Sequence, residues 1–194
     1  MSLSFHAPWG RTTGAVLPTG SAADQIVAAG STLTATLIDA GAPAVLIPAD
    51  EAGIDLSVMT GNLSEHLPRL VAARASAGLM MGLRKPEDPP QNAVPKVGVV
   101  AAPGDYIAAD GTRIAADTHD LRVRMLSMLA PHPAIGLTSA VAVSLAAALP
   151  GSVVAKVLPR RSKLTKGAGF CASEHLPVSS PPRLSRTTTG TSAK

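Results

Sequence analysis

The stretches TLTATLID (residues 32–39), GAP (residues 41–43) and AVLI (residues 44–47) decide the fold class. In the first stretch β-branched residues alternate with other residues, which is the two-residue period of a half-buried strand. The Gly and Pro of residues 41–43 break this pattern, and a second apolar run follows at once. Two such runs separated by a short Gly/Pro segment are typical of neighbouring strands. We therefore predict a pair of strands that meet near Gly41.

Further strands are expected on both sides of this pair. Residues 15–17 form a short apolar run that ends in a Pro-Thr-Gly turn. Residues 96–102 give the clearest strand signal of the chain, because they are apolar on both faces. A turn at residues 109–112 and a short strand at 113–115 predict a hairpin.

Two helices are predicted between and after these strands. The first follows a possible cap at Asn62 or Ser64, begins regularly near Pro68 and extends to about residue 83. The second is expected to be capped by Asp117 or Thr118. Its inner face would carry three apolar residues: Leu121, Met125 and Leu129.

A third helix and a last strand complete the expected domain. Residues 138–149 are apolar nearly all round, which is typical of a buried helix rather than a surface helix. Thr138 or Ser139 would cap this helix, and a Pro-Gly pair at residues 150–151 would end it. A strand is expected over residues 152–158. Strands mixed with helices in this way predict an α+β domain.

The composition excludes several classes of protein. The chain has 194 residues, of which 46% are hydrophobic, 15% charged and only 2% aromatic, so we expect a globular domain with an aliphatic core. Cys171 is the single cysteine, which excludes an internal disulfide framework and a cysteine-rich zinc site, and fits a cytoplasmic location. The apolar stretch over residues 135–149 is shorter than the roughly 20 residues of a membrane-spanning helix. The N-terminus lacks the pattern of a secretory signal.

The positive charge is concentrated at the C-terminal end. Residues 1–155 carry 9 Lys and Arg against 12 Asp and Glu, whereas residues 156–194 carry 8 against 1. We expect an irregular segment over residues 1–14, one domain over 15–158 and a basic, disordered Ser/Thr/Pro-rich tail over 159–194. The tail carries no reading or stacking motif, so nucleic-acid binding is not expected.

Six short motifs in a fixed order resemble one protein family. The motifs are VLPTG (residues 16–20), TLIDAGAP (36–43), VPKV (94–97), PGDY (103–106), RMLSM (124–128) and AALPGS (147–152). None is specific alone, but in this order, spread over roughly 140 residues, they resemble the PrpF family. That family includes 2-methylaconitate cis–trans isomerases and 4-oxalomesaconate tautomerases.

The resemblance implies a diaminopimelate-epimerase-like fold, in which each of two similar domains is a curved mixed sheet wrapped around a buried central helix. The chain corresponds to the second domain only, and this domain is incomplete at its C-terminal end. The first domain, which in the family carries a catalytic lysine and a cysteine in an Asn-Cys-Gly-Asn setting, is absent. The catalytic residues therefore remain unknown, and Cys171 is not expected to replace the missing cysteine.

Two further departures from the family pattern bear on function. The family has Gly-Asn-Pro where this chain has Gly41-Ala42-Pro43, so a polar group that faces the cleft is lost. After the last predicted strand the family continues with a Gly-His-Pro-Ser-Gly stretch and more strands, whereas this chain continues into its basic tail. We expect the missing strands to leave a sheet edge unpaired and the chain prone to aggregate.

Thr138 and Ser139 are candidate substrate-binding residues. They lie at the start of the third predicted helix, where free backbone N–H groups and the helix dipole favour an anion. By the resemblance, this place corresponds to the family's cleft loop. The alternative is that both hydroxyl groups only cap the helix.

Lys96 and His132 are the other candidates. Lys96 begins a strand that is otherwise apolar and could pair with a substrate carboxylate, or it could simply keep the strand end soluble. His132 lies between two prolines and could orient substrate or move a proton, or it could be merely exposed. Asp39 ends a strand and is expected to bond nearby backbone rather than act as a base. No metal site and no cofactor are expected.

The resemblance leads to two alternative functions. The first is a fragment of a cofactor-independent isomerase of unsaturated di- or tricarboxylic acids that acts by proton transfer and is weak or inactive alone. The second is a non-catalytic interaction domain that pairs with a partner carrying the missing half. Under either, the expected partners are a small carboxylic acid or a chain with the first domain, and neither nucleic acid nor membrane.

Overall fold

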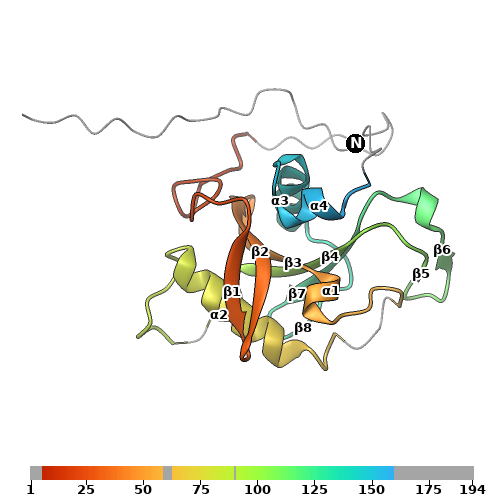
Figure 1. The fold of residues 1–194 in the computed structure, drawn as a ribbon, viewed down its shortest axis with the longest axis horizontal. Helices are drawn as coiled ribbons and strands as arrows, with labels where there is room; N and C mark the ends of the chain where they lie inside the picture. Colours follow the sequence, from red (N-terminus) through yellow and green to blue (C-terminus); the bar gives the residue numbers. More distant parts are fainter. Residues whose placement is uncertain (1–5, 59–62, 90, 160–194) are drawn as a thin grey trace, which may run out of the picture.

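The computed structural model describes residues 6–58, 63–89 and 91–159. A six-stranded mixed sheet forms its centre, with strand order β1-β2-β3-β4-β7-β8 (Figure 1). The strands of this sheet are β1 (Asp24–Ala28), β2 (Ser31–Ala40), β3 (Ala42–Pro48), β4 (Lys96–Ala101), β7 (Arg122–Ser127) and β8 (Ala130–Pro131). A separate hairpin pairs β5 (Tyr106–Ile107) with β6 (Arg113–Ile114). The helical segments are α1 (Ala49–Ala52), α2 (Leu67–Met80), the 3-10 turn η1 (Ala116–Thr118), α3 (Leu137–Ala148) and α4 (Val153–Val157).

The strand pair at Gly41 is confirmed. β2 and β3 are antiparallel, with Ile38 opposite Ala44 and Ala40 opposite Ala42. β3 is parallel to β4, and β4 is antiparallel to β7. The α+β class and the mixed sheet are therefore confirmed as well.

Each face of the sheet carries its own core. Leu37, Val45 and Val99 lie on the face covered by α2, whereas Ile38 and Leu46 lie on the face covered by α3 and α4. Figure 1 shows this arrangement, with α2 on one side of the sheet and the pair α3 and α4 on the other. Successive residues of β2 alternate between the two cores, which explains the period of its sequence.

The prediction of a strand at residues 15–17 is wrong, and the strand at the edge of the sheet is β1 instead. The carbonyl of Val16 accepts a hydrogen bond of 2.9 Å from the amide of Asp39, but the surrounding segment is irregular. β1 was missed because its sequence, DQIVA, is short and only Ile26 and Ala28 are buried in it. It pairs with β2 through the hairpin turn at Ala29 and Gly30.

The second predicted helix is also wrong, because residues 122–127 form β7. The apolar spacing of Leu121, Met125 and Leu129 fits a helix, but tertiary pairing decides the outcome: β7 lies antiparallel along β4 from Arg122 to Leu126. Only a single 3-10 turn, η1, forms at the expected start, and Thr118 ends this turn rather than capping a helix.

The last predicted strand is a short helix, α4. The hydroxyl of Ser152 accepts a hydrogen bond of 2.9 Å from the amide of Ala155, which caps the helix. The hydroxyl of Thr36 in β2 accepts one of 2.9 Å from the amide of Val153. A side chain more than a hundred residues away thus satisfies the first turn, which no local pattern predicts.

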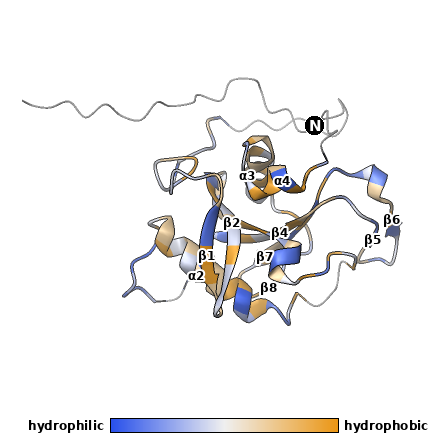
Figure 2. Cartoon of the chain, viewed as in Figure 1, coloured by the Kyte–Doolittle hydropathy of each residue, from blue (hydrophilic) through white to orange (hydrophobic). Residues whose placement is uncertain are grey.

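Helix α3 forms where expected but differs in burial and in its cap. Its cap residue is Gly136, so Thr138 and Ser139 lie inside the first turn. Figure 2 shows an apolar helix, yet only Ser139, Ala142, Val143 and Ala146 are buried. The prediction of a helix buried all round is wrong for the described residues, since they cover only one side of α3. Leu137 at its start is 55% exposed.

The tail predicted over residues 159–194 lies, apart from Pro159, outside the described residues, and Cys171 lies there too. Among the residues described, no helix is both long enough and apolar enough to cross a membrane.

Candidate functional site

One end of the sheet, on the face covered by α3, brings the predicted site residues together. Lys96 is the first residue of β4 and lies opposite Ala44 of β3. Ala44 belongs to the core beneath α3. Because residues opposite each other in a ladder point to the same face, the Lys96 side chain leaves the sheet on the α3 side. It is half-buried.

The neighbouring strand adds a hydroxyl group that the sequence analysis missed. Val97 pairs with Leu126 at the end of the β4–β7 ladder, so Ser127 lies next to Lys96 one position beyond that end. Gly98 pairs with Met125, and a β-carbon there would contact Met125 and Leu46 on the α3 face. By alternation Ser127 points to the same face as Met125. The RMLSM motif contains this serine, but assigning the segment to a helix concealed its register.

His132 directly follows β8 and lies on the same face of the sheet. Its amide donates a hydrogen bond of 2.8 Å to the carbonyl of Met125, so it follows β8 in register with β7. Its Nδ1 accepts a bond of 3.3 Å from the amide of Ala134. The neutral ring therefore carries its proton on Nε2, which is available as a donor. The side chain is half-buried.

The first turn of α3 packs against the sheet at this end. A β-carbon at Gly41 would lie 2.8 Å from the carbonyl oxygen of Thr138, so the β2–β3 turn lies directly against the helix start. Gly41 has a φ of +68°, which also favours glycine. Among the described residues no side chain caps α3, and its first N–H groups are left for another acceptor. The cap residue is Gly136 and neither hydroxyl caps the helix, so the capping role predicted for Thr138 or Ser139 is wrong. Thr138 is exposed and Ser139 is buried.

Asp39 lies near the end of β2 and bonds backbone, as the sequence analysis predicts. One of its carboxylate oxygens accepts bonds of 2.8 Å from the amide of Thr12 and 2.7 Å from the amide of Thr13. The hydroxyl of Thr13 donates a third, of 3.0 Å. Asp39 is 1% exposed, and the three bonds fasten the segment before β1 to the end of β2. The prediction that it bonds backbone is confirmed.

The arrangement is suited to holding an anion. Lys96 supplies a full positive charge, and the N-terminus of α3 supplies a partial one. Ser127 and the Nε2–H of His132 add neutral donors on the same face. Within the described residues no group of three or more His, Cys, Asp or Glu side chains could hold a metal ion.

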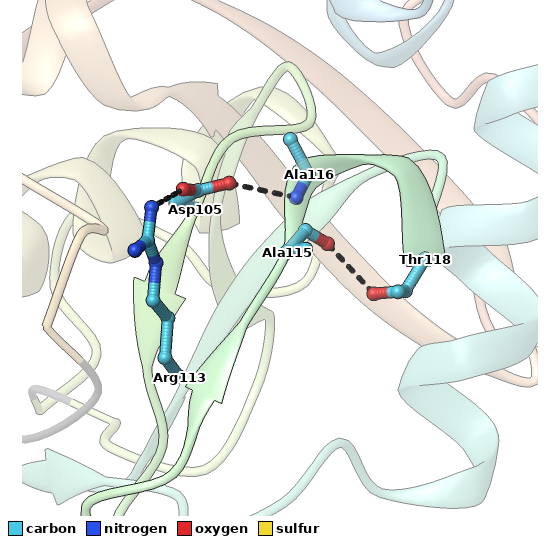
Figure 3. Close-up of polar contacts among 5 residues, drawn as sticks. All are labelled: Asp105, Arg113, Ala115, Ala116 and Thr118. Atoms are coloured by element: carbon cyan, nitrogen blue, oxygen red, sulfur yellow. Dashed lines mark hydrogen bonds and ion pairs between the residues drawn. The ribbon is translucent and has the colours of Figure 1, made fainter.

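A second polar cluster lies beyond the opposite end of β4. Arg113 donates a bond of 2.5 Å to Asp105, whose other oxygen accepts one of 2.9 Å from the amide of Ala116 (Figure 3). The Thr118 hydroxyl donates one of 2.7 Å to the carbonyl of Ala115. The bond from Arg113, followed by the bond from Ala116, holds the pKa of Asp105 below its ordinary value. These bonds tie the β5–β6 hairpin to η1.

Comparison with known proteins agrees with the resemblance. The model of the family described as "PrpF protein" matches residues 1–173. The chain is 38% identical over 147 residues to the 2-methyl-aconitate isomerase of Cupriavidus necator, covering 73% of this chain and 37% of that protein. It is 33% identical over 157 residues to the (4E)-oxalomesaconate Delta-isomerase of Novosphingobium sp. (strain KA1), covering 79% of this chain and 38% of that protein.

A solved structure gives the same answer for the fold. A methylitaconate-delta-isomerase is similar with a TM-score of 0.73 and 25% identity, covering 80% of this chain and 42% of that one. The chain thus spans about two fifths of the length of the proteins that it matches. The family model covers well over half of the 194 residues. The chain therefore belongs to the PrpF family.

Proposed function

We propose that this chain is the carboxylate-binding part of an isomerase of unsaturated di- or tricarboxylic acids. The proposal is supported by the register, which puts Lys96 and His132 on the α3 face at one end of the sheet, and by the contact of Gly41 with the start of α3 at that end. The similar proteins are named as isomerases of methylaconitate, oxalomesaconate and methylitaconate, all of which are carboxylic acids.

In this proposal the chain holds and orients the substrate. The Lys96 ammonium pairs with one carboxylate, and the amides at the start of α3 donate to another, together with the hydroxyls of Thr138 and Ser139. The Nε2–H of His132 donates to a further oxygen. Ala42 offers no side-chain donor where the family has asparagine, so one contact is lost. No cofactor takes part.

The base that moves the proton is not among these residues, since the family's catalytic lysine and cysteine belong to the first domain. In this proposal the domain spans residues 15–158 and has a fold of the diaminopimelate-epimerase type. The match to only about two fifths of the length of its relatives supports a single domain. The chain alone should therefore bind the acid with little or no turnover. In the whole enzyme the first domain would close over the end of the sheet.

Binding is tested by titrating the isotopically labelled full chain with tricarballylate, an unreactive tricarboxylate, and following its amide NMR signals. We expect saturable shifts at Lys96, Ser127 and residues 136–139. The proposal fails if no signal saturates, or if the shifts merely follow the ionic strength.

Turnover is tested by mixing the chain with 2-methylaconitate and following the ultraviolet absorbance of the conjugated acid. We expect no rate above background. Robust turnover by the chain alone would contradict the proposal that catalysis needs the family's first domain.

A second function, that of an interaction domain, is favoured by one observation. Four large apolar side chains at the same end of the sheet are exposed by 44–56%: Met128, Leu129, Ile135 and Leu137, here called the apolar rim. Exposed apolar groups gathered in this way mark interaction sites. The partner would be a chain that carries the family's first domain. Co-purification with such a chain, unaffected by Lys96→Met, would favour this function over substrate binding.

A further inference from the structure

Arg74 is a buried cation with no carboxylate partner among the described residues. It lies in the middle of α2, on the sheet face opposite α3, and is 1% exposed. Burial lowers its pKa. Its Nε donates a hydrogen bond of 3.2 Å to the carbonyl of Pro95, and its Nη1 donates one of 2.8 Å to the carbonyl of Met128. Its Nη2 is buried and has no hydrogen-bond partner in the part of the chain that the structure describes.

These two carbonyls flank the candidate site. The β4–β7 ladder runs as far as the pair of Val97 and Leu126. The next position holds Lys96 beside Ser127, and the one after it holds Pro95 beside Met128. The Arg74 guanidinium thus joins the segment before β4 to the segment after β7, directly beyond the end of the ladder. Lys96 and Ser127 therefore lie between the Val97–Leu126 pair on one side and the two hydrogen bonds of Arg74, here called the Arg74 clamp, on the other.

The Arg74 clamp holds a turn whose backbone conformation is unfavourable at Met128. Met128 and Leu129 form the two-residue turn between β7 and β8, and Met128 has a φ of +53°. Glycine is the usual residue at such a position. The Met128 side chain is 56% exposed, so packing does not hold it in this conformation, whereas the bond from Arg74 holds its carbonyl. Unfavourable backbone of this kind gathers at functional sites.

A structural role alone does not explain a charge at this position. Burying an unpaired guanidinium is costly, and an apolar side chain of similar volume often stabilises a fold better. A planar fork with several donors, however, can fix two carbonyls relative to each other as no apolar group can.

We propose that Arg74 is a positioning residue, which sets the spacing of Lys96 and Ser127 from the opposite face of the sheet. This inference rests on the proposed function, because those two residues matter only if the end of the sheet binds substrate. Arg74 itself does not touch the ligand.

The test compares amide hydrogen exchange in the full chain with that in three variants. Arg74→Met keeps the apolar stem and removes both bonds, and Arg74→Lys keeps one positive charge without the fork. Arg69→Met is the matched control, because Arg69 lies on the same helix but donates to Ala52, with a bond of 3.0 Å.

In Arg74→Met we expect exchange at Val97 and His132 to accelerate at least about tenfold, with Ile38 and Leu46 nearly unchanged. Arg74→Lys should lie between Arg74→Met and the unmodified chain, and Arg69→Met should leave His132 unchanged. Equal acceleration at all four amides, or none at His132, overturns the inference. If Arg74→Met does not fold, Arg74→Lys tests the inference by the same comparison: exchange at Val97 and His132 should accelerate more than exchange at Ile38 and Leu46.

Measuring the tricarballylate affinity of the same variants separates this inference from the proposed function. Tricarballylate affinity should fall about tenfold in Arg74→Met and by less in Arg74→Lys. Unchanged affinity despite faster exchange at His132 overturns the positioning role. If the unmodified chain does not bind tricarballylate, the proposed function fails, and the exchange pattern still decides whether Arg74 holds the two strand ends.

Discussion

At the scale of single residues, Gly41 joins the sheet to α3. Gly41→Ala would bring a β-carbon to 2.8 Å from the carbonyl oxygen of Thr138 and place alanine at a φ of +68°. We expect the free energy of unfolding to fall by about 2–4 kcal/mol, the sum of the backbone cost and overpacking. Urea denaturation measures this change.

The matched control is Gly30→Ala in the β1–β2 turn, where φ is +79° and nothing lies within 4 Å of an added β-carbon. It isolates the backbone cost, which is about 1 kcal/mol. Equal losses in the two variants would show that the contact with α3 contributes nothing.

Met128 gives a prediction of the opposite sign. Its side chain is 56% exposed and its φ is +53°, so Met128→Gly removes an unfavourable backbone conformation and little packing. The variant should be more stable by up to about 1 kcal/mol. Thermal unfolding checks it, with Leu129→Gly as the control that should give no gain. A less stable Met128→Gly would mean that the methionine packs in a way its exposure does not indicate.

At the scale of elements, the β5–β6 hairpin should loosen in acid. Hydrogen bonds from Arg113 and Ala116 lower the pKa of Asp105. A carboxyl group whose folded pKa is depressed contributes stability above its unfolded pKa, and this is lost as the pH falls through the folded value. NMR signals of Tyr106 and Ile114 should therefore change below about pH 4, the unfolded value. Asp105→Asn should abolish that acid step, and a step that persists would assign it to another group.

The elements that could be predicted are those whose pattern is local. β2, β3 and β4 carry alternating or continuous apolar residues between Gly and Pro, and the structure places them as expected. The errors fall where distant contacts decide. β7 carries a helical spacing but pairs with β4. The segment of α4 has the pattern of a strand, but Ser152 caps it as a helix and Thr36 of β2 accepts a hydrogen bond from the amide of Val153.

At the scale of the whole molecule, the apolar rim should cause self-association. The double variant Leu129→Lys/Ile135→Lys should reduce the apparent mass at high concentration, measured by light scattering after gel filtration. Val27→Lys is the control, because Val27 is 63% exposed but lies on β1, at the other edge of the sheet. If only the control reduces association, the edge strand and not the rim causes it.

The candidate site could be predicted in part. Residue type and family resemblance point to Lys96, His132, Thr138 and Ser139. The strand register brings Lys96 and His132 to one end of the sheet, and the contact between Gly41 and α3 brings Thr138 and Ser139 there. Ser127 could not be found while its segment was assigned to a helix. Arg74 could not be found at all, because an arginine in a largely apolar helix gives no sign of which carbonyls it will reach.

The central claim is that this end of the sheet binds a carboxylic acid through Lys96. Calorimetric titration with tricarballylate tests it most directly, comparing Lys96→Met with Lys85→Met, which removes the same charge from an exposed loop. A charge-assisted hydrogen bond contributes about 1.5–3 kcal/mol, so Lys96→Met should weaken binding at least about tenfold and Lys85→Met hardly at all. Equal weakening in both variants, or no measurable binding by the unmodified chain, would contradict the claim.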